Sequence, residues 1–383
     1  MRILFLPRYA PQGASSRYRI WQYVPSFERA GHEVEVHPLL DAGYLTQLYS
    51  EQTRGLRWLA KGYARRLIEM VSARRYDAII CEQEAFPYLP AFGESLFRKN
   101  GTPLFLDFDD AAHIKYENSS LLRHKIPRLI AAAEAVVVGN NYLAQYARQF
   151  TRNVCVIPSV VDLSRYPVSR TKSVSEEIII AWIGIPATAE FLKPLLPVFH
   201  KLQDKYPQLR FRFIGAGSQF PANGLNADLP DWSQQTETDL LAESDIGIMP
   251  LPDTQFTRGK CGLKLIQYMA AHLPVVASPV GANCEIVVEA ENGFLANGNE
   301  DWFAKLSVLI DNPALRRKFG AAGRKRVERH YSLESGFAKW TDILNLANTP
   351  AARRANVALP KAELLHPTGD PLIQAEECTE GTK

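Results

Sequence analysis

The sequence predicts an α/β protein built from two doubly wound domains, each with a mainly parallel sheet between layers of helices. Short apolar runs typical of buried strands alternate with longer stretches in which apolar residues recur every three or four positions. This alternation begins near residue 2, stops at a polar segment and starts again at residue 178. A chain of 383 residues is long enough for two such domains.

The first half holds the strands of an N-terminal domain, residues 1–167. Amphipathic stretches separate these strands, and one of them is predicted as a helix from about residue 16 to 30. The polar segment 168–177, rich in Ser, Thr, Lys and Arg, is predicted as a linker. The predicted strands are 2–6, 34–36, 77–81, 103–108, 135–138 and 154–157.

The pattern restarts in a C-terminal domain, residues 178–332, with predicted strands 178–183, 210–214, 246–250, 274–278 and 293–295. A helix at 333–348 follows, and we expect it to return to the N-terminal domain. The tail 349–383 has no apolar period and is expected to be disordered. Because open α/β sheets bind ligands at the carboxyl ends of their strands, the two domains should face each other across an interdomain cleft.

Composition excludes several classes of protein. The net charge of +3 gives no global basicity for binding nucleic acid. No apolar run approaches the roughly 20 residues of a membrane-spanning helix, and the first residues are predicted as a strand, not a signal peptide. Five scattered cysteines without a CxxC pair argue against a disulfide framework or a zinc site. We therefore expect a cytoplasmic protein.

The densest set of candidate ligand-binding residues lies where a loop with glycine and lysine opens the predicted helix 262–271. The first amides of this helix lack intrahelical partners and can bind phosphate oxygens. Lys264 and Gln267 share a helix face, and Lys260 lies one turn earlier. The alternative is that the lysines are solvated and the glycines only cap, and spacing alone does not separate the two. The candidates are Arg258, Lys260, Cys261, Gly262, Leu263, Lys264 and Gln267.

The run from Arg258 to Ala277 resembles the donor-binding segment of the retaining GT-B glycosyltransferases of the glycosyl transferase group 1 domain family. The segments 320–324, 331–332, 159–162 and 13–19 also resemble stretches of this family. The resemblance implies the GT-B fold of two Rossmann-like domains. It also implies transfer of a sugar from a UDP- or GDP-sugar to a glycan or lipid-linked acceptor. It further implies that the configuration is retained and that neither a metal nor a cofactor is required. The expected context is cell-surface polysaccharide synthesis.

The same resemblance assigns loop residues to the two substrates. Gly184, Thr188 and Gly215 follow strands of the C-terminal domain and are expected beside the donor. On the acceptor side we expect the glycine loop after the first strand, with an acid that ends the third strand. The alternative for the two arginines is that they lie on a helix surface. The acceptor-side residues are Gly13, Ser15, Arg17, Arg19 and Glu82.

The sequence departs from the family at its paired glutamates, whose positions are taken by Gly259 and Gln267. Gln267 can still hydrogen-bond a ribose but brings no negative charge. His272 stands where the family has a glycine at the helix end, and a left-handed backbone there would cost roughly 1 kcal/mol. These changes fit either a divergent active enzyme or a non-catalytic partner subunit. A nucleotide-sugar epimerase is a further alternative.

A second candidate site follows the predicted strand 103–108, where Asp107, Asp109 and Asp110 are clustered. Carboxylates this close repel one another, which raises the pKa of at least one of them unless a cation intervenes. Asp109 and Asp110 are the predicted catalytic residues, with Asp109 facing the sugar. Two alternatives are helix capping by Asp110 and an Asp-x-Asp metal motif of the other glycosyltransferase fold.

The stretch from Arg54 to Arg75 holds seven basic residues and one acid among apolar positions at helical spacing. Such a helix can rest on an anionic membrane surface, which would make the protein peripheral on the inner face of the cytoplasmic membrane. The alternative is a helix of the domain with a solvated cationic face.

Overall fold

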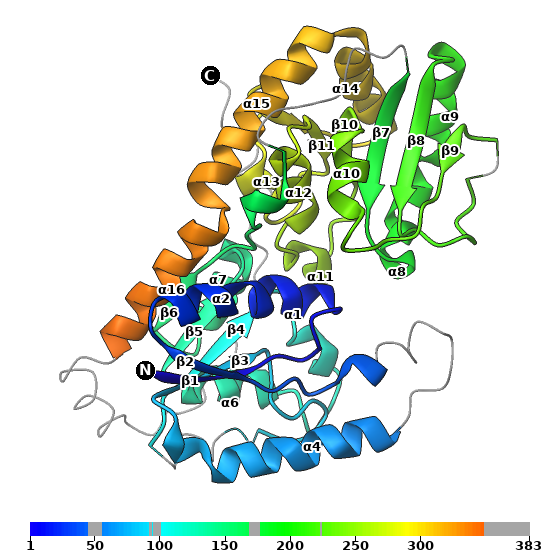
Figure 1. Cartoon of the computed structure of the whole chain (residues 1–383). Coiled ribbons are helices and arrows are strands. Elements are labelled where there is room, and N and C mark those ends of the chain that lie inside the picture. Colours follow the sequence, from blue (N-terminus) through cyan, green and yellow to red (C-terminus); the bar gives the residue numbers. More distant parts are fainter. Residues whose placement is uncertain (45–55, 92–93, 95–100, 168–176, 223, 348–383) are drawn as a thin grey trace.

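The computed structural model describes residues 1–44, 56–91, 94, 101–167, 177–222 and 224–347. Two six-stranded parallel sheets, each covered by helices, form the two halves of the molecule (Figure 1). The predicted fold class of two doubly wound α/β domains is therefore confirmed. The predicted linker, apart from Glu177, and the predicted tail lie outside the described residues.

The N-terminal sheet has the strand order β2-β1-β3-β4-β5-β6, with every pair parallel. The strands β3 and β4 are buried along their whole length because apolar clusters cover both faces of the sheet. The strands are β1 (Arg2–Leu6), β2 (Glu33–Val36), β3 (Ala78–Glu82), β4 (Leu104–Phe108), β5 (Ala135–Val138) and β6 (Val154–Val156).

The helix expected from 16 to 30 is in fact two helices, α1 (Ala14–Arg19) and α2 (Val24–Arg29), joined by a 3₁₀ turn at Trp21–Tyr23. Pro25 explains part of the break, since proline lacks an amide hydrogen and is favoured in the first turn of a helix. The other helices of this domain are α4 (Leu56–Val71), α6 (Lys125–Ala132) and α7 (Asn141–Arg148).

The C-terminal sheet has the order β12-β11-β10-β7-β8-β9. The chain runs from β7 to one side and then to the other, so the topological switch point lies between β7 and β10, where doubly wound sheets bind ligands. The short strand β9 was not predicted. The strands are β7 (Ile178–Ile183), β8 (Leu209–Ile214), β9 (Ala227–Asp228), β10 (Ile246–Met249), β11 (Val275–Ala277) and β12 (Gly293–Leu295).

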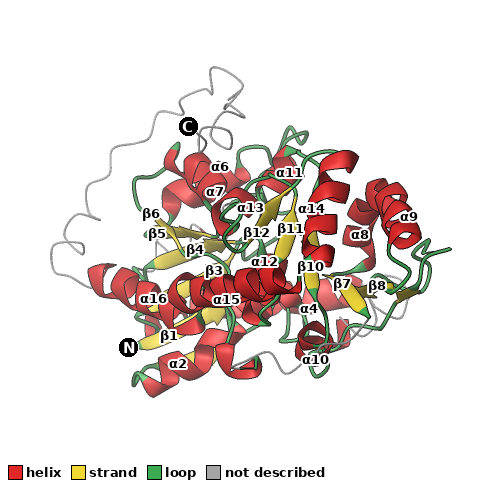
Figure 2. Cartoon of the chain, turned by 90° about the horizontal axis from the view of Figure 1, so that it is seen from above, coloured by secondary structure: helices red, strands yellow, loops and turns green. Residues whose placement is uncertain are grey.

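Helices cover both faces of this sheet (Figure 2). The short helices α10 and α11 were not predicted, and prolines 194 and 197 interrupt the stretch after β7. The helices are α8 (Pro186–Ala189), α9 (Leu196–Lys205), α10 (Glu237–Ala242), α11 (Gln255–Arg258), α12 (Leu263–Ala270), α13 (Asn283–Ile286), α14 (Asn299–Asp311), α15 (Pro313–His330) and α16 (Leu333–Ala347).

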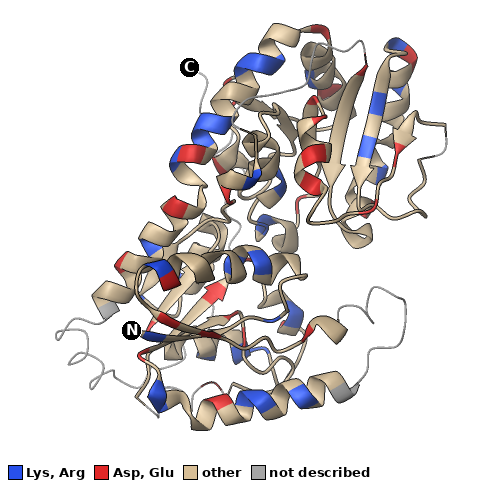
Figure 3. Ribbon diagram, in the orientation of Figure 1, with Lys and Arg blue, Asp and Glu red and all other residues tan. Residues whose placement is uncertain are grey.

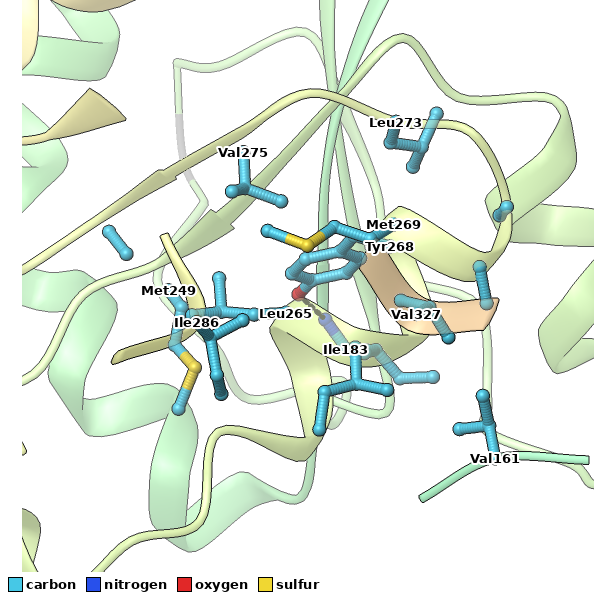
Figure 4. Close-up of a cluster of buried hydrophobic side chains, with 14 of the residues drawn as sticks. Val161, Ile183, Met249, Leu265, Tyr268, Met269, Leu273, Val275, Ile286 and Val327 are labelled. Atoms are coloured by element: carbon cyan, nitrogen blue, oxygen red, sulfur yellow. Dashed lines mark hydrogen bonds between the residues drawn. The ribbon is translucent and has the colours of Figure 1, made fainter. Parts of the chain in front are cut away.

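Helix α12 is fixed by Tyr268, whose ring lies in a cluster of buried apolar side chains (Figure 4). Its hydroxyl accepts a hydrogen bond from Ile183 N at 3.0 Å and donates to Ile248 O at 3.2 Å. A Cβ at Gly247 would collide with the ring, so only glycine lets the helix approach the sheet this closely. The orientation of Lys264 and Gln267 therefore follows from the packing of the same helix.

Helix α16 lies against the N-terminal domain, although it follows the C-terminal one (Figures 1 and 2). Phe337 packs edge-to-face on Phe27 with centroids 5.0 Å apart, and Trp340 is buried in the same cluster as Phe5. The last helix thus ties the two domains together.

Candidate active site

A single hydroxyl connects two carboxylates at the carboxyl ends of β3 and β4. Ser15 Oγ, on α1, lies 2.6 Å from Glu82 Oε1 and also contacts Asp109 Oδ2. Gln83 Nε2 donates to the other oxygen of Asp109 at 2.9 Å. Glu82 is buried and also accepts from Ser16 Oγ and from Arg8 N. The structure therefore brings together Ser15, Glu82 and Asp109, three of the predicted site residues.

The contacts of Ser15 require a shared proton. A hydroxyl has one hydrogen, so it can donate to only one of the two carboxylates, and the other must donate to it in the protonated form. Burial, and then the charge of Asp109, raise the pKa of Glu82 to about 7. Glu82 is therefore the group to which we assign the shared proton.

The prediction of an acceptor role for Arg19 is wrong for this conformation. Its guanidinium is buried and binds both oxygens of Asp107, while Nη1 donates to Ile157 O at 2.8 Å. A guanidinium that is buried and paired in this way is not accessible to a ligand phosphate in this conformation. In this pair each buried charge is satisfied by the other. The pairing could not be predicted from the sequence because Arg19 and Asp107 lie 88 positions apart.

Asp110 joins the two domains. Its Oδ2 accepts from Lys260 Nζ at 2.7 Å, and Oδ1 accepts from Ala111 N at 3.1 Å. No α-helix begins at Asp110, so the capping alternative does not hold. Burial raises the pKa of Asp110, although Lys260 opposes the shift. Lys260 is thus paired with a carboxylate of the other domain, where the sequence predicted a phosphate ligand.

The loop before α12 is docked on the N-terminal domain by its backbone. Asn140 Nδ2 donates to Gly259 O at 3.1 Å and to Lys260 O at 3.0 Å. Cys261 Sγ lies 3.0 Å from Asp109 O, and burial raises the pKa of this thiol well above its usual value. A Cβ at Gly259 would lie 2.7 Å from Ala111 Cβ. A glutamate at this position would not fit between the domains as they are packed.

A cavity of about 1010 Å³ lies beside this loop, between α7 and the loops that follow β10, β11 and β12. Arg258 is the predicted donor residue that lines it. The guanidinium is held by Asp253, with Nε 2.6 Å from Oδ1 and Nη2 2.9 Å from Oδ2. This pairing leaves Arg258 fixed at the wall of the cavity.

The start of α12 presents amides and one cation. Gly262 has φ +65°, the left-handed conformation that favours glycine, and the amides of Leu263 and Lys264 begin the helix. Lys264 Nζ lies 4.1 Å from the centroid of the Trp182 ring. Within the part of the chain that the structure describes, it has no hydrogen-bond acceptor or carboxylate partner. Burial, and then Lys260, lower the pKa of Lys264 to about 7.

Gln267 does not lie open to a ligand. It is buried, and its Nε2 donates to Tyr18 OH of the N-terminal domain at 3.0 Å. In this conformation the amide of Gln267 therefore cannot make the predicted contact with a donor ribose. The amide instead belongs to an interdomain cluster in which Tyr18 OH donates to Glu237 Oε1 at 3.2 Å.

The predicted glycines allow close approach at strand ends. A Cβ at Gly184 would collide with Trp182, and one at Gly215 would collide with Gly184 O. A Cβ at Gly13 would lie 2.5 Å from Tyr9 Cβ. Thr188 Oγ1 donates to Ile185 O at 3.0 Å, which closes the turn after β7. Gly184, Thr188 and Gly215 shape the carboxyl edge of β7 and β8, and Gly13 shapes the loop after β1.

The sequence also missed residues that surround Arg17. Glu237, which is fully buried, accepts from Trp232 Nε1 at 2.8 Å and from Arg165 Nη2 at 2.9 Å. The guanidinium of Arg17 stacks on Trp232 with a centroid distance of 4.7 Å. Glu237 lies in α10, which had no helical signal strong enough to predict, so no motif pointed to this cluster.

Among the described residues, no three His, Cys, Asp or Glu side chains are grouped as the ligands of a metal ion would be. No helix among the described residues is long and apolar enough to cross a membrane.

Residues 178–312 match the family described as glycosyl transferases group 1. Sulfoquinovosyl transferase SQD2 of Arabidopsis thaliana is 29% identical over 159 residues, which are 39% of this chain and 29% of that protein. A D-inositol 3-phosphate glycosyltransferase of Geodermatophilus obscurus is 27% identical over 270 residues, 61% of this chain and 56% of that protein. This chain thus spans less than a third of the first relative and just over half of the second.

A solved structure of Anabaena Alr3699/HepE in complex with UDP and glucose is similar over 90% of this chain and 100% of that chain. The TM-score is 0.67 and the sequence identity 16%, so this likeness establishes the fold. The GT-B fold expected from the resemblance is confirmed.

Proposed function

We propose that this chain, whose residues 178–312 match the family described as glycosyl transferases group 1, transfers a sugar from a nucleotide-sugar donor to an acceptor hydroxyl. One observation carries the proposal: Asp109, on the N-terminal domain, is held near the loop that opens α12, where Lys264 has no anionic partner among the described residues. A carboxylate and a cation on facing domains suit the two charges that separate when a glycosyl–phosphate bond breaks.

In the proposed reaction, the bond from the anomeric carbon to the donor phosphate breaks as the acceptor hydroxyl attacks from the same face. Asp109 stabilises the positive charge on the sugar. Lys264 and the first amides of α12 stabilise the departing phosphate. The acceptor proton passes to that phosphate, so configuration is retained and no strong protein base is needed. We propose that the reaction needs no metal ion.

The donor that we propose is a UDP- or GDP-sugar, since the donor-side loops resemble those of this family. Binding of each candidate should raise the stability of the native state, and a thermal-shift screen of UDP-, GDP-, ADP- and CMP-sugars identifies it. Release of the nucleoside diphosphate in the presence of glycan or lipid-linked acceptors then measures transfer. Activity that survives EDTA would support metal independence, and activity abolished by EDTA and restored by a divalent cation would contradict it.

The first variant to test is Asp109→Asn. It removes the charge but keeps the shape, so we expect turnover to fall about 100-fold or more while donor affinity changes little. Ser120→Ala is a control at an exposed position after the same strand. Turnover near that of the wild type in Asp109→Asn would contradict the role of Asp109. Conversion of the donor without acceptor would indicate an epimerase, and no binding of any nucleotide sugar would indicate a partner subunit.

The acceptor that we propose is a glycan or a lipid-linked sugar of cell-surface polysaccharide synthesis, reached at the inner face of the cytoplasmic membrane. Helix α4 supports this proposal, since basic residues lie along it at the edge of the N-terminal domain far from the C-terminal domain (Figure 3). Leu67, Ile68 and Val71 are exposed by 50%, 66% and 78% on the same helix. Exposed apolar side chains beside cations are typical of helices that lie on anionic membranes.

The structure changes which residues of the basic stretch could contact a membrane. Arg66 is buried, and it donates to His37 O and Pro7 O at 2.7 Å each. It therefore holds α4 on the domain. Arg54 lies outside the described residues. The proposed membrane face consists of Lys61, Leu67, Ile68, Val71 and Arg74.

A further inference from the structure

Two cations in the interdomain region lie on the faces of tryptophan rings. Lys264 Nζ, from the C-terminal domain, is 4.1 Å from the Trp182 centroid. Arg17 Cζ, from the N-terminal domain, is 4.7 Å from the Trp232 centroid. A cation over an indole face is held in place without a hydrogen bond, so its donors remain available to a ligand.

The two tryptophans pack on two neighbouring glycines, Trp182 on Gly184 and Trp232 on Gly215. A Cβ at Gly184 would collide with Trp182, and a Cβ at Gly215 would lie 3.0 Å from Trp232 Cβ. Gly215 itself lies against Gly184 O. The two rings are therefore separated by little more than the glycine turns that end β7 and β8. The two cations flank the carboxyl edge of the sheet at which doubly wound domains bind nucleotides.

Arg17 has hydrogen-bond donors that the protein does not use. The side chain is 7% exposed, and among the described residues neither Nε nor Nη1 has a hydrogen-bond partner. Nη2 lies 3.8 Å from Glu237 Oε2, beyond hydrogen-bond length. Buried donors without acceptors carry a free-energy cost, and the cost is larger for a charged group. An anion that accepts hydrogen bonds from these donors removes this free-energy cost. A solvated arginine on the surface has no such cost to remove, because water already satisfies its donors.

We propose that Arg17 and Lys264 form the two sides of one subsite for the diphosphate of the donor. This inference rests on the proposed function, since it takes the donor to be a nucleoside diphosphate sugar. It assigns Arg17 to the donor, whereas the sequence suggested the acceptor. Because the cations come from different domains, the diphosphate links the domains directly, and its binding favours the closed arrangement.

The test uses inorganic pyrophosphate, which probes the subsite without knowledge of the donor base, alongside UDP and GDP. Calorimetric titration of the full chain compares wild type with Arg17→Gln and Lys264→Gln. We expect each variant to weaken pyrophosphate binding about tenfold or more, since each loses a charge-assisted contact. Arg165→Gln is the matched control, because Arg165 also pairs with Glu237 but its Nη2 is satisfied by Gln234 O at 2.8 Å. Its affinity should stay within about twofold of wild type.

Arg17→Lys serves as a second variant if Arg17→Gln does not fold. It should bind pyrophosphate with intermediate affinity, because lysine keeps the positive charge but lacks the forked donors of the guanidinium. Unchanged pyrophosphate affinity in the folded Arg17 variants would overturn the inference, as would an equal loss in Arg165→Gln. Failure of the proposed function gives a different result. In that case pyrophosphate binds and depends on both cations, but no sugar is transferred from any donor.

Discussion

Ser15 links two carboxyl groups of the candidate site through one hydroxyl. Its hydroxyl contacts both Glu82 and Asp109, and the proton that this arrangement requires resides on the more deeply buried Glu82. Asp109 faces the interdomain region, where a positive charge develops on the sugar in the proposed reaction. The three side chains act as one unit.

The shared proton predicts a pH-dependent stability difference. Because the pKa of Glu82 is raised to about 7 in the folded state, the native protein binds a proton that the unfolded chain releases between about pH 4.5 and 7. Wild type should therefore lose up to about 3 kcal/mol of stability relative to Glu82→Gln as the pH rises through this window. Urea unfolding at pH 5 and pH 8 measures it. A stability difference that is the same at both values would contradict the shared proton.

Lys264 predicts a pH-dependent affinity. Burial lowers the pKa of its ammonium to about 7, so the cationic form that attracts phosphate is progressively lost above this pH. Pyrophosphate affinity should fall between pH 7 and 9 in wild type, and binding should be accompanied by proton uptake. Lys264→Arg stays charged and should give a flat profile over this range. Titrations in buffers of different ionisation enthalpy measure the uptake, and none in wild type would contradict the lowered pKa.

At the residue scale, the sequence predicted best where chemistry shows in a short motif. Asp109 and Lys264 follow strand-end and helix-start patterns, and both lie at the candidate site. Arg19 and Gln267 were misassigned because their partners, Asp107 and Tyr18, lie 88 and 249 positions away. A single sequence contains no signal for such pairings, since they depend on how the domains pack.

At the element scale, the strands were predicted well because continuous apolar runs mark strands that are buried on both faces. The predicted run 178–183 is β7, and 135–138 is β5. The helical stretches were less reliable, since prolines divide them into short pieces that share one apolar period. Helices of four to six residues, such as α10 and α11, are shorter than the window over which that period can be recognised.

Helix α4 carries the prediction at this scale. If its exposed face rests on anionic lipid, Ile68→Asp with Val71→Asp should abolish sedimentation with vesicles that contain phosphatidylglycerol, because both apolar insertion and charge attraction are weakened. The fold should survive, since the two side chains are exposed by 66% and 78%. Val308→Asp, an exposed position on α14 in the C-terminal domain, is the control and should still sediment. No sedimentation of wild type at low salt would contradict the proposal.

At the scale of the whole molecule, the two domains are joined by directional contacts at several points. Asn140 binds the backbone of the loop before α12, Lys260 reaches Asp110, and Gln267 binds Tyr18. Helix α16 adds apolar packing on the opposite side of the connection. The sequence predicted two domains that face a common cleft, but it could not predict how closely they pack, since the close approach depends on glycines at the interface, one of which lies in the loop before α12.

That residue is Gly259. Any Cβ here would meet Ala111 Cβ at 2.7 Å and Ala111 N at 3.0 Å, and a backbone atom cannot move aside as the end of a flexible side chain can. Gly259→Ala should therefore separate the loop before α12 from the N-terminal domain and lower the free energy of unfolding by about 1–3 kcal/mol. The separation would also lengthen the ion pair between Lys260 and Asp110. Small-angle scattering of the variant should show a larger radius of gyration than wild type.

Gln255→Ala is the matched control, since Gln255 is exposed on α11 just before the same loop and its truncation leaves the domain contact intact. Comparing the two variants also tests why glycine stands at position 259, where the family that this sequence resembles has a glutamate. If Gly259→Ala keeps the wild-type radius and stability, the loop has room for a side chain, and the absence of glutamate at 259 is then unrelated to domain packing. If the radius of gyration grows, glycine at position 259 is what permits the close packing of the domains. In that packing, Asp109 and Asp110 of the N-terminal domain are the carboxylates that lie near the loop before α12.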